Sequence, residues 1–134
     1  MTQPQLDDLF TRSPAGAIPN GEARGTAILA PGTPLSDEIA EAIELFAWQG
    51  KTFDAARGTL VNSVSPLRVH AVAAQVYVAP SWSDGKPCIV LDYSKTSVVA
   101  HWVRDEIRLV APNVYLGVAF WWRKRIINFS LEFF

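Results

Sequence analysis

From residue 51 onward, apolar and polar residues alternate in short runs, and this period of two is typical of β-strands. The final run is the clearest, with apolar Ile127, Phe129, Leu131 and Phe133 alternating with polar Asn128, Ser130 and Glu132. Other runs predict strands at residues 24–30, 51–54, 59–64, 69–79, 88–93 and 114–122. Gly58 ends the link between the second and third of these strands, where a hairpin turn needs a positive φ.

Helical patterns are fewer and shorter. A mid-chain helix is predicted over residues 33–50, because a Thr that can cap it is followed by a Pro suited to the first helical position. Residues 4–12 are expected to form one or two helical turns, so that residues 1–22 make an N-terminal clasp and a turn-rich loop. A short connector helix is expected at Val103–Val110.

These elements predict a mainly β fold. About seven strands joined by short turns favour a small antiparallel β-barrel, since closure removes exposed strand edges. An α+β cone, in which the mid-chain helix plugs an open curved sheet, is the alternative. The 134 residues suit one barrel domain spanning the whole chain, with one hydrophobic core.

Composition and charge exclude several classes of partner. The net charge of -1 argues against nucleic-acid binding, and no apolar run reaches the ~20 residues of an integral membrane segment. The basic cluster Arg123, Lys124 and Arg125 is interpreted as a solvated hairpin tip, with contact to an anionic lipid or phosphate as the alternative. The single cysteine, Cys88, and the lack of a secretion signal predict a cytoplasmic protein. We expect a monomer or a homodimer.

Ionisable residues inside strand-like runs are the candidates for chemistry. Asp92 shares an alternating face with Cys88 and Val90, so it is a buried carboxylate if that face points inward. It would then need a partner such as Arg104, or its pKa would rise; otherwise it bonds backbone at the end of its strand. The Arg104-Asp105-Glu106 cluster is read first as a salt-bridge network, and second as an anion-binding Arg104 beside an acid or base, Glu106.

Histidines and aromatic residues add further candidates. His101 suits proton transfer, but the distance in sequence between His70 and His101 does not match a metal motif, and neither a metal nor a cofactor is expected. Aromatic rings with a polar handle suit flat hydrophobic ligands. The residues expected to bind a ligand are Tyr77, Trp82, Tyr93, Arg104 and Tyr115.

Several motifs together resemble a known group of proteins. They are Trp48-Gln49-Gly50-Lys51, the segment from Pro80 to Pro87, Leu91-Asp92-Tyr93-Ser94, the segment from Val103 to Arg108, and the segment from Pro112 to Gly117. Through them the chain resembles a family of small uncharacterised bacterial lipocalin-like (calycin-type) β-barrel proteins over nearly its whole length. The resemblance implies a barrel with a hydrophobic interior and no known catalytic residues. Asn113 stands where similar proteins generally have Gly, which fits because Asn tolerates a positive φ.

Three functions follow from these observations. The first is binding of a small hydrophobic ligand with an acidic or polar end inside a barrel pocket, where Arg104 or Tyr115 orients it. The second is a cofactor-independent isomerase, cyclase or lyase whose base is Asp92, Glu106 or His101, so the sequence leaves open whether the protein is an enzyme. The third is a module that meets a protein or membrane surface through exposed aromatic residues such as Trp121 and Trp122.

Overall fold

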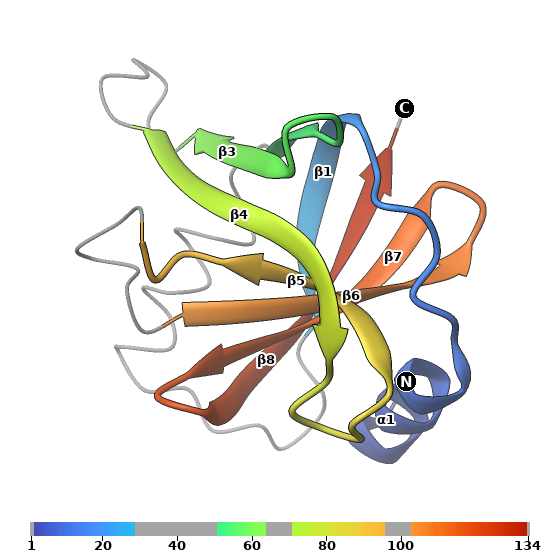
Figure 1. The fold of residues 1–134 in the computed structure, drawn as a ribbon. Coiled ribbons are helices and arrows are strands. Elements are labelled where there is room, and N and C mark those ends of the chain that lie inside the picture. The colour runs from blue at the N-terminus through green and yellow to red at the C-terminus, as the bar shows by residue number, and fades with distance from the viewer. Residues whose placement is uncertain (1, 29–50, 64–70, 96–102, 134) are drawn as a thin grey trace.

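The described part of the chain folds as a closed antiparallel β-barrel. The computed structural model describes residues 2–28, 51–63, 71–95 and 103–133. Within them lie one helix and eight strands: α1 (Gln3–Arg12), β1 (Gly21–Ile28), β2 (Lys51–Asp54), β3 (Thr59–Ser63), β4 (Ala71–Pro80), β5 (Pro87–Asp92), β6 (Val103–Ala111), β7 (Val114–Trp121) and β8 (Lys124–Phe133). Each strand pairs with its sequence neighbour, and β1 pairs with β8 to close the barrel (Figure 1).

The mainly β class, the antiparallel barrel and a short N-terminal helix are thereby confirmed. The connector helix predicted at Val103–Val110 is wrong, because this segment is strand β6. Its charged residues fall on both faces of the strand and both faces are covered, so the polar-apolar alternation that marks a half-buried strand is absent. The mid-chain helix predicted over residues 33–50 lies outside the described residues.

The barrel interior is filled mainly by large apolar side chains from β1 to β8. Ile127, Phe129 and Leu131 of β8 point into it, as their alternation predicts. The ring of Phe129 lies over Gly117 of β7, where an added Cβ would come 2.2 Å from the ring. This close approach requires a residue without a side chain.

Helix α1 covers the outer surface of the barrel over β7 and β8. Leu6 and Phe10 of the helix pack on Leu116, Val118 and Phe120 of β7. The helix begins at a capping box formed by Thr2 and Gln5, in which each side chain bonds the other residue's backbone N–H. Because α1 lies here, the outward face of β8 is partly buried, and Asn128 is only 2% exposed although its sequence pattern predicts an exposed face.

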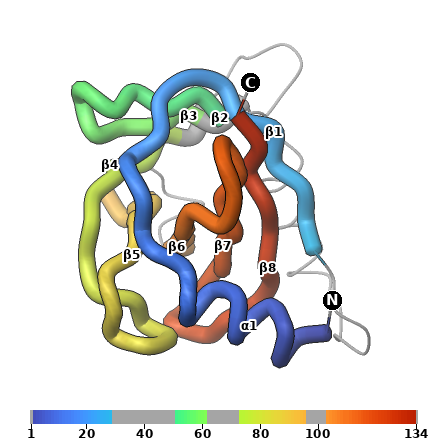
Figure 2. The backbone as a smooth tube through the Cα atoms, turned by 90° about the vertical axis from the view of Figure 1, so that its right-hand side faces the viewer, coloured from blue at the N-terminus to red at the C-terminus, as the bar shows by residue number. Residues whose placement is uncertain are grey.

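The segment that follows α1 crosses the end of the barrel next to the β6–β7 turn (Figure 2). The Leu109 backbone N–H donates to the carbonyl oxygens of Pro14 and Ala15, at 3.1 and 3.3 Å. The Tyr115 hydroxyl donates to Ala17 O at 2.6 Å, and Ile18 packs against the interior residues. This end of the barrel is therefore covered by the chain's own N-terminal segment.

A buried ion pair fixes the β4–β5 turn against the outer surface of β6. Arg108 of β6 is fully buried and its Nη1 and Nη2 donate to the two carboxylate oxygens of Asp84, at 2.6 and 2.7 Å. The same guanidinium donates to the carbonyl oxygens of Phe10 at 2.8 Å, Lys86 at 3.1 Å and Pro87 at 3.2 Å. One side chain thus joins β6, the β4–β5 turn and the end of α1.

The substitution Asp84→Asn tests this clamp. It leaves the buried Arg108 charge without its carboxylate, and we expect the free energy of unfolding to fall by about 3 kcal/mol in urea titrations. Asp8→Asn is the matched control, because it breaks an exposed ion pair with Arg12 and should cost less than about 1 kcal/mol. Equal effects of the two substitutions would show that Arg108 is not held in the way described.

Candidate functional site

Three charged residues follow one another along the outward face of β6, and we refer to Arg104, Glu106 and Arg108 as the charged row. Glu106 at its centre is fully buried. Its carboxylate accepts hydrogen bonds from the Ser81 hydroxyl at 2.6 Å, the Trp82 backbone N–H at 2.8 Å and Arg104 Nε at 3.1 Å. Every charge in the row has partners. The Arg104–Glu106 pair agrees with the salt-bridge network suggested by the sequence, but Asp105 lies on the opposite face of β6 and takes no part in it.

These bonds position the ring of Trp82. Arg104 Cζ lies 4.3 Å from the centroid of the Trp82 ring, and Arg123 Cζ, from the β7–β8 turn, lies 4.4 Å from it. Phe120 meets the same ring edge to face at 5.3 Å. Both arginines thus make cation–π contacts with Trp82.

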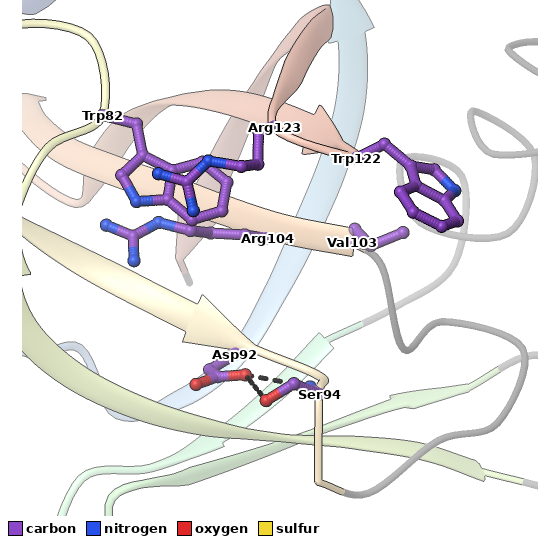
Figure 3. A pocket seen from close by; sticks show the side chains of 7 residues that line it. All are labelled: Trp82, Asp92, Ser94, Val103, Arg104, Trp122 and Arg123. Carbon is purple, nitrogen blue, oxygen red and sulfur yellow. Dashed lines mark hydrogen bonds between the residues drawn. The ribbon is translucent and has the colours of Figure 1, made fainter.

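A pocket of about 490 Å³ opens beside this stack, and we call it the rim pocket. It is lined by Trp82, Asp92, Ser94, Val103, Arg104, Trp122 and Arg123. Figure 3 shows Trp82, Arg104 and Arg123 grouped on one side, Trp122 on the other, and Asp92 with Ser94 at the end of β5. The pocket combines aromatic and apolar surface with a small number of charged groups, as ligand sites in proteins do.

Asp92 points outward rather than into the barrel, because Leu91 and Tyr93 occupy the inward face of this part of β5. It accepts hydrogen bonds from the Tyr77 hydroxyl at 2.7 Å and from the Ser94 backbone N–H and hydroxyl at 2.9 and 2.6 Å. Partial burial by itself would raise the pKa of Asp92, but the bonds from Ser94 and Tyr77 outweigh it and the pKa is lowered. Asp92 is therefore a satisfied carboxylate at neutral pH and a poor general base.

The β7–β8 turn carries two residues in the left-handed region, Trp122 at φ 53° and Arg123 at φ 65°. Two-residue hairpin turns of this form favour Asn-Gly, and each residue with a larger side chain costs roughly 1–2 kcal/mol in this conformation. The same turn places Trp122 and Arg123 at the rim pocket. Strain of this kind concentrates at functional sites.

The residues proposed from sequence are spread over three locations. Trp82, Arg104 and Asp92 lie at the rim pocket, and Tyr77 contacts it through Asp92. Tyr93 and Tyr115 are buried in the barrel interior, where burial raises the pKa of Tyr115. Glu106 is buried under the β4–β5 turn, and His101 lies outside the described residues.

Sequence reasoning missed a pair of charges inside the barrel. Lys51, the first residue of β2, and Asp105, the third residue of β6, are both fully buried on the inward face. Burial raises the pKa of Asp105 to about 7 and lowers that of Lys51 to about 8, while the opposite charge of each moderates the shift in the other. Within the described structure, neither carboxylate oxygen of Asp105 accepts a hydrogen bond.

Other chemical roles find less support. Cys88 is buried and its thiol donates to Ala79 O at 3.4 Å, and burial raises its pKa to about 12, so it is not a nucleophile at neutral pH. Over the described ranges, no three His, Cys, Asp or Glu side chains are grouped closely enough to hold a metal ion. None of the described helices is long and apolar enough to cross a membrane.

No protein-family model, curated protein or solved structure matches the chain. The resemblance to lipocalin-like proteins therefore stays a prediction.

The raised pKa of Asp105 predicts how the stability of the protein depends on pH. The folded protein binds the Asp105 proton more tightly than the unfolded chain does, because the pKa changes from 3.8 to about 7 on folding. The contribution of Asp105 to the free energy of unfolding should therefore fall as pH rises from about 4 to about 7. Urea titrations at several pH values measure the free energy of unfolding. Between about pH 4 and about 7 this free energy should change with pH differently in the wild-type protein and in the Asp105→Asn variant.

Asp84 and Asp92 do not contribute to the expected difference between wild type and Asp105→Asn over this pH range. Asp84 and Asp92 have lowered pKa values, so the stability they add is present above their unfolded pKa and is lost only at more acidic pH. If the free energy of unfolding changed with pH in the same way for wild type and Asp105→Asn, the assignment of Asp105 as a buried carboxylate without hydrogen bonds would be contradicted.

Proposed function

We propose that the protein binds a small organic anion with an apolar body in the rim pocket. Arg123 carries this proposal: its guanidinium lies against Trp82 in the pocket, and no carboxylate of the described residues is paired with it. A guanidinium presents paired N–H donors that match a carboxylate or phosphate group. The pocket volume of about 490 Å³ is in the range of small-molecule sites.

The other charges at the pocket are already balanced. Arg104 donates through Nε to Glu106 and through Nη2 to Pro80 O at 2.9 Å, so its main role is to hold the turn and the Trp82 ring. Asp92 is held by Tyr77 and Ser94. Arg123 is thus the cation available to a ligand, and we assign it the orienting role that the sequence suggested for Arg104 or Tyr115.

The strained turn supports the same proposal. Trp122 is 58% exposed, which is a poor use of a large aromatic side chain in folding but suits contact with the apolar body of a ligand. A chain selected only for stability would favour Asn-Gly at positions 122 and 123. Retaining Trp and Arg there is explained if both residues contact a ligand.

A lipocalin-like role, with the ligand inside the barrel, has less support among the proposed residues. Tyr115 donates its hydroxyl proton to Ala17 O and is committed to holding the N-terminal segment. The aromatic residues of the interior pack against one another, as in the edge-to-face contact of Tyr115 and Phe133 at 5.6 Å. The rim pocket is therefore our choice for the anion site.

Isothermal titration calorimetry with 2-naphthoate tests the proposal. The wild-type protein should bind 2-naphthoate and should bind the neutral analogue 2-naphthylmethanol much more weakly. Arg123→Gln should weaken binding of 2-naphthoate by about 10- to 100-fold, since a charge-assisted hydrogen bond contributes about 1.5–3 kcal/mol. Arg125→Gln is the matched control, because Arg125 on the same hairpin pairs with Asp7 at 2.6 Å, and it should leave binding unchanged.

A second variant separates binding from folding. Replacing Trp122 and Arg123 by Asn and Gly should raise the melting temperature, by relieving the strain, while it abolishes binding of 2-naphthoate. Equal binding by the wild type and Arg123→Gln would overturn the proposal. Binding to phosphatidylglycerol vesicles without any binding of 2-naphthoate would favour a membrane-surface module instead.

A further inference from the structure

The lining of the rim pocket includes a carboxylate, Asp92, as well as the guanidinium of Arg123. We propose that Asp92 is a specificity residue of this pocket: it restricts the ligand to a single acidic group, bound at Arg123, and excludes a second acid at the far end of the ligand. The inference rests on the proposed function, because it names the class of anion that the same pocket accepts. That class is an apolar monoacid rather than a diacid.

Asp92 and Arg123 line separate parts of the rim pocket (Figure 3). Arg123 belongs to the β7–β8 turn and lies against the Trp82 ring, whereas Asp92 is the last residue of β5. A pocket of about 490 Å³ holds one small molecule, so a ligand that fills it comes close to every side chain of the lining. An acid held at Arg123 therefore has its other end on the side of the pocket where Asp92 lies.

Asp92 keeps its negative charge at neutral pH. Its hydrogen bonds come from neutral donors: the Tyr77 hydroxyl at 2.7 Å, and the backbone N–H and hydroxyl of Ser94 at 2.9 and 2.6 Å. Partial burial opposes ionisation, but the bonds from Ser94 and Tyr77 outweigh it, so the pKa of Asp92 is lowered. These bonds satisfy the carboxylate as an acceptor, yet its charge still acts on a ligand in the pocket.

A second acidic group on the ligand would have no cation of its own. Arg104 lies opposite Asp92 on β6, but its Nε donates to Glu106 at 3.1 Å and its Nη2 donates to Pro80 O at 2.9 Å. Of the cations that the structure describes in the lining, Arg123 alone has no carboxylate partner. One acid can therefore pair with Arg123, while another would meet the negative charge of Asp92.

Repulsion between like charges is an effective basis for selectivity. Proteins discriminate between related ligands by placing an unfavourable charge against the wrong one as well as by making contacts to the right one. Salt screens charges only partly over the dimensions of a small-molecule pocket, because the Debye length is about 8 Å at physiological ionic strength. Asp92 is thus close enough to any ligand in the rim pocket to disfavour a second acid.

Isothermal titration calorimetry with two acids of the same shape tests the inference on the wild-type protein. 2,6-Naphthalenedicarboxylate has a second acid at the far end of the ring system, and 6-carbamoyl-2-naphthoate has a neutral amide in the same place. The protein should bind the dicarboxylate about 5- to 10-fold more weakly than the amide. Raising the salt concentration should reduce this ratio, because salt screens the repulsion. Since the two compounds differ in charge and not in size, a poor steric fit would weaken both alike.

The substitution Asp92→Asn identifies the residue responsible. It removes the charge and keeps the shape of the side chain, so the dicarboxylate and the amide should bind within about 2-fold of each other. Asp8→Asn is the matched control, because it removes the same charge from an exposed ion pair on α1, outside the pocket lining, and it should retain the full preference for the amide. Melting curves establish that each variant is folded.

The outcomes separate this inference from the proposed function. Equal binding of the dicarboxylate and the amide by the wild-type protein would overturn the role of Asp92 and leave the anion site at Arg123 standing. A preference for the amide that persists in folded Asp92→Asn would do the same. If the wild-type protein bound no 2-naphthoate, the proposed function itself would be overturned, and the inference with it.

Discussion

Charged side chains on the outer face of β6 stay buried only because the β4–β5 turn and α1 supply their hydrogen-bond partners. Arg108 and Glu106 are both fully buried, and each would destabilise the fold strongly if left alone. Asp84 forms an ion pair with Arg108. The Ser81 hydroxyl and the Trp82 backbone N–H donate hydrogen bonds to Glu106. The position of the turn, and with it the Trp82 ring at the rim pocket, follows from this single requirement.

The charged residues that the structure describes fall into two groups, those that have an ion-pair or hydrogen-bond partner and those for which none is found. Partnered ones, such as Arg108 with Asp84 and Asp92 with Tyr77, fix one part of the barrel against another and have little left to offer a ligand. Arg123 at the rim and Asp105 in the interior lack such partners among the described residues. A molecule bound beside Arg123 would complete the hydrogen bonding there, which supports the proposed anion site.

The sequence predicts the barrel well where one face is apolar and the other polar, as in β8, and where a turn requires a particular residue. Gly58 (φ 64°) and Asn113 (φ 60°) both take the positive φ expected of them. The prediction from sequence is wrong for β6, because a strand that is covered on both faces shows no alternation of polar and apolar residues. It also groups Asp105 with its neighbours in one charged cluster, although successive strand residues point to opposite faces and only Asp105 faces inward.

Among the described residues, carboxylates with partners, such as Asp84, hold the parts of the barrel together, whereas Asp105 is buried without a hydrogen-bond donor and has a raised pKa. A pH titration of the folded protein by NMR, with ¹³C-labelled Asp carboxyl groups, measures this directly. We expect Asp84 to titrate below its usual range and Asp105 to titrate at about 7. Titration of both groups near the ordinary value of about 3.9 would contradict it.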